Sequence, residues 1–165
     1  MSRLIPESEF TCAVDALPLV SIDLCIVFNG LLLLGKRNNR PAKGFLFTPG
    51  GRIRKNEALN SAFSRIAGEE LCLENYSLSQ NMLMGVWDHF YNDSAFSDDV
   101  STHYINLPYL CEIQPQMKKK LLLPKGRDKQ HSNWTWMDLE TASKSNIVHK
   151  YVRAYANWIL NQKII

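Results

Sequence analysis

A short apolar hairpin constrains the fold of this chain more than any other feature of its sequence. Residues 18–28 (PLVSIDLCIVF) are almost uniformly apolar, and a run of this length indicates a largely buried strand. Asn29-Gly30 comes next, a dipeptide that is typical of two-residue hairpin turns because both positions accept a positive φ angle. Residues 31–36 then predict the returning strand.

The rest of the chain mixes strand and helix patterns. Val148, Val152, Tyr155 and Ile159 recur at helical spacing and predict an amphipathic last helix. Because strands and helices follow one another without a linker or repeat, we expect a single α/β domain over residues 1–165. The other expected elements are strands at 45–48, 82–91, 102–112 and 133–137, helices at 57–71 (with Asn56 as N-cap), 138–145 and 147–162, and a basic loop at 116–131.

The composition excludes several classes of protein. Hydrophobic residues make up 45% and charged residues 21% of the chain, as in ordinary globular proteins. The longest apolar run, Leu31 to Leu34, is too short to cross a membrane, and the N-terminal residues lack the apolar stretch of a secretory signal. A formal net charge of +3 is too small to indicate a nucleic-acid partner but suits an anionic small substrate. We therefore expect a cytoplasmic protein with reduced cysteines.

One acidic side chain stands out in the first of the expected helices. At about 100° per residue, Glu70 falls near the centre of the face formed by the apolar residues Leu59, Ala62, Phe63 and Ile66. A carboxylate that faces a protein core is costly unless it is paired or binds a cation. Three explanations are open: the helix frays before Glu70, Glu70 pairs with an arginine, or Glu70 binds a cation.

The residues around this helix favour the cation. Gly50-Gly51 lacks side chains, so its backbone can approach a ligand closely. Arg52, Arg54 and Arg65 supply charge that suits a chain of phosphates, and Arg65 could otherwise hold the inward carboxylate. Carboxylate and backbone carbonyl oxygens are the hard ligands that Mg²⁺ uses when it bridges to substrate phosphates. The segment therefore predicts a diphosphate–metal site.

This stretch resembles the Nudix hydrolases, whose signature box reads G-x5-E-x7-R-E-U-x-E-E-x-G-U, where U is a bulky aliphatic residue. Three positions depart from the box: Ile66 stands where it has the glutamate after arginine, Ala67 fills an aliphatic position, and Cys72 replaces the last glycine. That missing glutamate belongs to the catalytic and metal-binding set of ordinary Nudix pyrophosphatases. The positions that match in register are Gly51, Glu57, Arg65, Glu69, Glu70 and Leu73.

Longer stretches narrow the resemblance to the GDP-mannose mannosyl hydrolases, a Nudix branch that also lacks this glutamate. They include LLLGKRNNRPAKGF, FTPGGR, GVWDHFYND and KQHSNWTW, and the resemblance covers about residues 10–136. It implies a Nudix-like α/β/α sandwich with a mixed sheet. It also implies hydrolysis of GDP-mannose or GDP-glucose to GDP and free hexose, by attack of water at sugar C1 with inversion.

The same resemblance implies a metal site and a base. One Mg²⁺ per subunit would be held by the carbonyl of Gly50 and by the side chains of Glu70 and Gln130. His131 would act as the general base that takes a proton from the attacking water. Residues 125–128 (KGRD) lengthen the loop before it, and their positive charge would either lower the pKa of His131 or lie in solvent.

Other residues are candidates for contacts with the substrate. Arg37, Arg52 and Tyr104 would stabilise the negative charge that develops on the departing GDP. Asp23 lies inside an apolar strand, so it either pairs with an arginine or contacts the sugar. The resemblance adds three N-terminal residues, which in the family reach the site across a homodimer interface: Leu4, Ile5 and Phe10.

Two other functions stay open. A conventional Nudix pyrophosphatase would cut the P–O bond of a nucleoside diphosphate sugar, and the apolar Ile66 argues against it. A non-catalytic sugar-nucleotide-binding module would not need a base, and the joint presence of Arg37, Glu70, Gln130 and His131 argues against that. In each case the expected partner is a nucleotide sugar, and no nucleic acid or membrane is expected.

Overall fold

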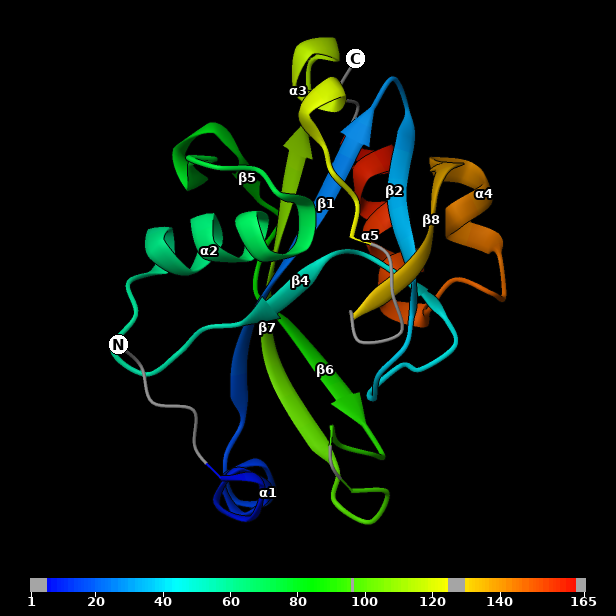
Figure 1. The fold of residues 1–165 in the computed structure, drawn as a ribbon. Helices are drawn as coiled ribbons and strands as arrows, with labels where there is room; N and C mark the ends of the chain where they lie inside the picture. The colour runs from blue at the N-terminus through cyan, green and yellow to red at the C-terminus, as the bar shows by residue number, and fades with distance from the viewer. Residues whose placement is uncertain (1–5, 96, 125–129, 163–165) are drawn as a thin grey trace.

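The computed structural model describes residues 6–95, 97–124 and 130–162, and it shows a twisted mixed sheet with helices packed on both sides (Figure 1). The main path of the sheet runs β3-β2-β1-β7-β5, while β4 pairs with β1, β6 with β7, and β8 with β2. The β1–β7 pair is parallel and the others are antiparallel. The strands are β1 (Leu19–Phe28), β2 (Leu31–Arg37), β3 (Leu46–Phe47), β4 (Gly50–Arg52), β5 (Met82–Leu83), β6 (Trp87–Tyr91), β7 (Thr102–Glu112) and β8 (His131–Asp138).

The hairpin expected at the start of the domain is confirmed. Strands β1 and β2 pair in antiparallel register, with Phe28 opposite Leu31. Asn29 and Gly30 between them have φ angles of 49° and 75°, the two positive values that a tight hairpin turn requires. The dipeptide therefore sets the register of the two strands.

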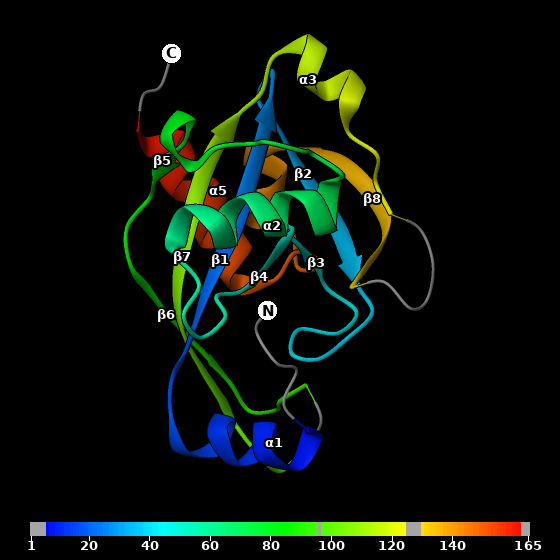
Figure 2. The same cartoon turned by 60° about the vertical axis from the view of Figure 1, so that its left-hand side comes forward.

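Helices form one layer on each face of the sheet, as two views show (Figures 1 and 2). Helix α2 (Leu59–Leu71) packs on one face, and α4 (Leu139–Lys144) and α5 (Lys150–Asn161) pack on the other. Each layer has its own buried apolar cluster. The expected α/β/α sandwich with a mixed sheet is confirmed.

Alternation along β1 decides which of the two clusters each side chain joins. Ile22 and Leu24 pack in the cluster of α2, whereas Cys25 and Val27 pack in the cluster of α5. Asp23 lies two residues before Cys25 and points to the same face of the sheet, where its carboxylate is hydrogen-bonded to Tyr155 of α5. An acidic residue inside an apolar strand is thus directed to one defined face of the sheet.

The helix that carries the signature box begins later than expected. Its first residue is Leu59 and its N-cap is Ala58, so the expectation that Asn56 caps the helix is wrong. Asn56 instead has a left-handed φ angle of 62° in the preceding turn. Leu59 is 39% exposed and does not share the buried face. The C-terminal half agrees with the expectation, because the helix continues through Glu70 and does not fray before it.

Four further segments differ from the expectation. The strand expected at 82–91 is divided into β5 and β6, and part of the basic loop expected at 116–131 forms α3 (Pro115–Lys120). A 3₁₀ turn, η1 (Leu78–Gln80), and an N-terminal helix, α1 (Glu7–Ala16), were not anticipated. Helix α1 lies beyond one end of the sheet, apart from the two helical layers (Figure 2). None of the helices in the described ranges is long and apolar enough to cross a membrane.

Candidate active site

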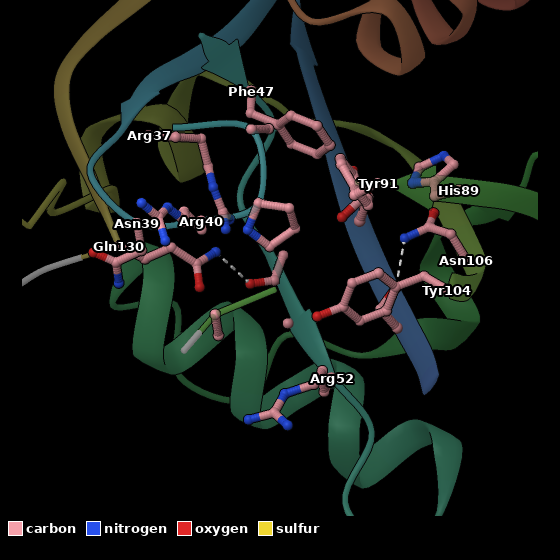
Figure 3. A pocket seen from close by; sticks show the side chains of 17 residues that line it. Arg37, Asn39, Arg40, Phe47, Arg52, His89, Tyr91, Tyr104, Asn106 and Gln130 are labelled. Carbon is pink, nitrogen blue, oxygen red and sulfur yellow. Dashed lines mark hydrogen bonds between the residues drawn. The ribbon is translucent and has the colours of Figure 1, made fainter. Parts of the chain in front are cut away.

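A cavity of about 480 Å³ opens where the strands β1, β4, β6 and β7 meet the loop that follows β2 (Figure 3). Its wall combines arginines, aromatic rings and buried polar side chains, a mixture that suits a charged ligand with a ring system. The residues that line it are Ser21, Asp23, Arg37, Asn39, Arg40, Pro41, Ala42, Phe47, Gly50, Gly51, Arg52, His89, Tyr91, Ala95, Tyr104, Asn106 and Gln130.

The double glycine allows two close approaches in the middle of this wall. Strand β4 lies against β1 with Gly50 opposite Asp23 and Gly51 opposite Ile22. A Cβ atom on Gly50 would collide with Oδ1 of Asp23, and one on Gly51 would lie 3.2 Å from the side chain of Ile66. Gly50 therefore leaves room for the carboxylate, while Gly51 lets α2 pack tightly on the strand.

Asp23 is a buried carboxyl group on the cavity wall. It is 6% exposed, and its Oδ2 accepts a hydrogen bond of 2.8 Å from the hydroxyl of Tyr155. Burial raises the pKa of this carboxyl group to about 7, and the Tyr155 hydroxyl and the Arg37 guanidinium oppose that rise only in part. No salt bridge between Asp23 and an arginine forms within the described residues, so the alternative of an arginine partner is not found.

The residues expected to hold a leaving diphosphate face the same space. Arg37, Arg52 and Tyr104 all line the cavity, and Figure 3 shows them arranged around it. The guanidinium of Arg37 lies over the ring of Phe47 at 5.7 Å, and its Nε is buried with no hydrogen-bond partner in the described part of the chain. Burial raises the pKa of the Tyr104 hydroxyl, and both arginines work against this rise. The hydroxyl therefore keeps its proton at neutral pH and can donate it in a hydrogen bond.

The N-terminal helix reaches this wall from outside. The guanidinium of Arg52 lies 4.0 Å from the ring centroid of Phe10, which is buried on α1. Phe10 is thus a support for a cavity arginine and is not itself among the described residues that line the cavity. The two other N-terminal candidates, Leu4 and Ile5, lie outside the described residues.

The three expected metal ligands belong to one connected group. Nε2 of Gln130 donates a hydrogen bond of 3.0 Å to the carbonyl of Gly50, as the dashed line in Figure 3 shows. His131 follows Gln130 in the chain, and its Nδ1 lies 3.0 Å from Oε2 of Glu70. Glu70 therefore has a histidine as its partner, and the alternative of an arginine partner is not found among the described contacts. Nowhere in the described ranges, this group included, do three His, Cys, Asp or Glu side chains gather in a metal-holding arrangement.

These donors fit a hard divalent cation. One carboxylate, one backbone carbonyl and one amide oxygen are ligand types that Mg²⁺ accepts. The amide of Gln130 would have to turn, so that its oxygen faces the cation and the Gly50 carbonyl is released from its hydrogen bond. Amide groups differ little in shape between the two orientations, and such a turn needs no movement of the backbone.

His131 lies beside the cavity and not on its wall. Its side chain is 1% exposed, and its Nε2 has no hydrogen-bond partner among the described residues. Across the strand pair it faces Arg37, which does line the cavity. Burial lowers the pKa of His131, the hydrogen bond to Glu70 raises it, and Arg37 lowers it further, with a net decrease. Residues 125–128, whose charge bears on the same question, lie outside the described residues.

Arg65 of α2 joins its own helix to the segment that precedes it, and none of its described contacts is with the carboxylate of Glu70. Its guanidinium contacts Glu57 at 2.7 Å and 2.8 Å, Glu69 at 2.9 Å, and the carbonyl of Arg52 at 2.9 Å. The hydrogen bond from Arg65 lowers the pKa of the Glu57 carboxyl group. Arg65 thus pairs with Glu69 four residues further along the helix, and no contact between Arg65 and Glu70 is found among the described residues.

Several cavity residues were not anticipated. Asn39, Arg40 and Tyr91 line the cavity, and Arg40 bridges to Asp98 at 2.5 Å. His89 also lines the cavity. Along β6 and β7 the available signal was the alternation of side chains, because every second residue of a strand points to the same face of the sheet. The loop residues carry no such periodicity.

Comparison with known proteins places these features in a family. The profile of the NUDIX domain matches residues 18–158. The low-salt glycan biosynthesis protein Agl8 of Haloferax volcanii is 42% identical over 101 residues, which is 61% of this chain and 63% of that protein. The alignment thus spans less than two thirds of the relative.

Solved structures show the same fold. A MutT NUDIX hydrolase from Burkholderia pseudomallei superimposes with a TM-score of 0.66 at 23% identity, over 87% of this chain and 98% of that one. A MutT protein from Methanosarcina mazei gives a TM-score of 0.67 at 18% identity, over 88% and 96%. At such identities the likeness concerns the fold alone.

Proposed function

This chain belongs to the NUDIX domain family, and on that premise we propose that it hydrolyses GDP-mannose or GDP-glucose to GDP and the free hexose. A Nudix hydrolase acts on a nucleotide-containing substrate and generally uses a divalent metal ion. The cavity wall supplies Arg37 and Arg52 for a diphosphate. Its polar side chains Asp23, His89 and Asn106 suit the hydroxyl groups of a hexose.

One observation carries the proposal: the contact between Glu70 and His131, next to the contact between Gln130 and Gly50. Gln130, just before β8, and His131, its first residue, thereby bring a metal ligand and a base close to the double glycine. Ile66, which stands where the signature box has a glutamate, is 1% exposed and packs on Gly51. An apolar side chain cannot act there as ligand or base, which favours attack at carbon over attack at phosphorus.

In this proposal His131 is the general base. Nδ1 donates its proton to the carboxylate of Glu70, which leaves the lone pair on Nε2 for the proton of the attacking water. Water then attacks C1 of the hexose, the bond from C1 to the phosphate oxygen breaks, and the sugar configuration inverts. Because Nε2 is buried, substrate binding has to open a path from the cavity to this atom.

The same residues would hold the cation and the leaving group. The carbonyl of Gly50 and the side chains of Glu70 and Gln130 would hold one Mg²⁺ per subunit. When bound, the cation supplies positive charge that neutralises the diphosphate. Arg37, Arg52 and the hydroxyl of Tyr104 add charge and a donor to the oxygen that leaves with GDP.

The proposal extends to the setting of the enzyme. We place it in the cytoplasm as a homodimer, with the N-terminal segment completing the substrate site of the partner. The contact of Phe10 with Arg52 supports a role of this segment near the cavity. The kinship with a glycan biosynthesis protein is compatible with a nucleotide-sugar substrate.

Hydrolysis in ¹⁸O-labelled water tests the reaction. The protein is incubated with GDP-mannose and Mg²⁺, and the products are analysed by mass spectrometry. Label in mannose, with GDP as the other product, is the expected result. Label in a phosphate, with GMP and a sugar phosphate, would establish the conventional pyrophosphatase. Binding of GDP-mannose without any product would establish a binding module.

A further inference from the structure

Tyr155 touches three side chains of the cavity from behind. Its hydroxyl oxygen lies 2.8 Å from Oδ2 of Asp23, 2.9 Å from Nε2 of His89 and 2.9 Å from Oδ1 of Asn106. These three partners line the cavity, whereas Tyr155 is buried on α5 and is not among the described residues that line it. One hydroxyl group is therefore shared by three of the polar groups that a ligand would meet.

The three contacts depend on one another because a hydroxyl group has one proton and two lone pairs. If Tyr155 donates to Asp23, Asn106 has to present its amide nitrogen and His89 its Nε2–H. If Tyr155 donates to Asn106, Asp23 has to carry a proton and His89 again presents Nε2–H. Donation to His89 would require both other partners to change. The arrangement that needs the fewest changes keeps the proton of His89 on Nε2.

Asn106 is held on its other side as well. Its Nδ2 donates a hydrogen bond of 2.8 Å to Oγ of Ser21, a contact that Figure 3 marks with a dashed line. The ring of Tyr151 stacks on the ring of His89 at 3.7 Å between centroids, with 7° between the planes. Asn106 and His89 are thus each held by a second contact, and the hydroxyl of Tyr155 links their donors and acceptors to the carboxylate of Asp23.

We propose that Tyr155 is a positioning residue whose hydroxyl group fixes the orientation of Asp23, His89 and Asn106 and thereby determines which hexose the cavity accepts. This proposal rests on the function proposed above, because it assumes that the hexose occupies this part of the cavity. Epimeric sugars differ in where one hydroxyl group points, and a fixed set of donors and acceptors discriminates between them. A mobile set would adapt to both epimers and lose the distinction.

The substitution Tyr155→Phe tests the role and keeps the ring, which packs against Trp87 at 5.1 Å. The ratio of kcat/KM for GDP-mannose to that for GDP-glucose should change about threefold to tenfold, the effect of one buried hydrogen bond. The affinity for GDP, which lacks the hexose, should stay as in the wild type. The control is Tyr76→Phe, because its hydroxyl is bonded to Asn81 at 2.6 Å in the opposite core cluster. It should leave the ratio unchanged.

A second measurement does not depend on activity. Long-range ¹⁵N correlation spectra show which ring nitrogen of a histidine carries the proton, and the variant His89→Gln assigns the signal of His89. The wild type should show Nε2–H, and Tyr155→Phe should move this signal towards a mixture of tautomers. An unchanged ratio of kcat/KM would overturn the proposal, as would an unchanged His89 spectrum. If neither GDP-hexose is hydrolysed, the function proposed above fails by itself, and the spectrum still decides whether Tyr155 positions His89.

Discussion

Nδ1 of His131 lies 3.0 Å from Oε2 of Glu70, a contact that joins the first residue of β8 to the last turn of α2. Because a carboxylate only accepts hydrogen bonds, this contact places the proton of the imidazole on Nδ1. Net lowering of the histidine pKa by burial keeps the ring neutral near pH 7, and Nε2 is left as the basic atom.

Removal of this base is the first prediction. His131→Gln should lower kcat by about 10²–10⁴, the range that general-base catalysis typically contributes. The dissociation constant of GDP should stay unchanged, because this residue does not line the cavity. Steady-state kinetics and calorimetry provide the two measurements. His103→Gln is a matched control, since that histidine is bonded to Asp88 on the outer part of β6 and β7.

A loss of less than about tenfold in His131→Gln would contradict the assignment of the base. Asp23 would then be the alternative, because it lines the cavity and has a pKa raised to about 7. In that event Asp23→Asn would show the large loss of kcat instead.

The second prediction concerns the cation. Glu70→Gln should weaken binding of Mn²⁺, a probe for Mg²⁺, by at least about tenfold, since even residues that merely support metal ligands have effects of this size. Titration followed by electron paramagnetic resonance measures it without substrate. Glu69→Gln is the control, because that carboxylate is half exposed and bonded to Arg65 and Arg54. Equal affinities in the two variants would exclude Glu70 as a ligand.

The third prediction is a dependence of stability on pH. The pKa of Asp23 rises from 3.8 to about 7 on folding, so between these values the folded state binds more protons than the unfolded state. Stability from this group is therefore lost as pH rises from about 4 to about 7. Asp23→Asn cannot ionise, and between pH 4.5 and 8 it should gain about 1–3 kcal/mol relative to the wild type.

Urea unfolding in the presence of EDTA measures this difference without interference from metal ions. Asp99→Asn, a change at an exposed position, should follow the wild type at every pH. Parallel curves for Asp23→Asn and the wild type would show that the carboxyl group is not desolvated in the folded protein.

The fourth prediction concerns the end of α2. Cys72, which replaces the last glycine of the signature box, is the C-cap and has a left-handed φ angle of 54°. A side chain in this region costs about 1–2 kcal/mol, so Cys72→Gly should raise the free energy of unfolding by about 1 kcal/mol. Cys12→Gly is the contrasting control, because it puts glycine inside α1 and should lower that free energy by about 1 kcal/mol. Equal effects of the two changes would refute the explanation.

Much of the fold follows from local patterns in the sequence. Asn29-Gly30 defines a hairpin because few other dipeptides accept two positive φ angles. Helix α2 could be predicted because its apolar residues recur at helical spacing over a long segment. Helix α1 was not predicted because it buries only Phe10 and Val14, which are too few residues to give a periodic apolar pattern. The prediction that Asn56 caps the helix was wrong because asparagine favours both N-caps and left-handed turns, and here it lies in a left-handed turn.

Adjacency in the chain predicted only part of the site. The double glycine and the box helix could be interpreted together, whereas Arg37, Tyr104, Gln130 and His131 were indicated by the resemblance to a family. The partner of Glu70 is 61 residues away, and no local pattern indicates which side chain arrives there. Loop residues such as Asn39 and Arg40 reach the cavity through tertiary packing, which the sequence does not encode as a period.

The bond between Asp23 and Tyr155 spans 132 residues. During synthesis, β1 and the whole signature box leave the ribosome well before the helix that carries Tyr155. A product that ends between residues 131 and 155 would thus contain Glu70, Gln130 and His131 but lack the hydroxyl that contacts the carboxylate of Asp23. This wall of the cavity is therefore completed late in translation, and fragments that still carry the family signature would lack one of its contacts.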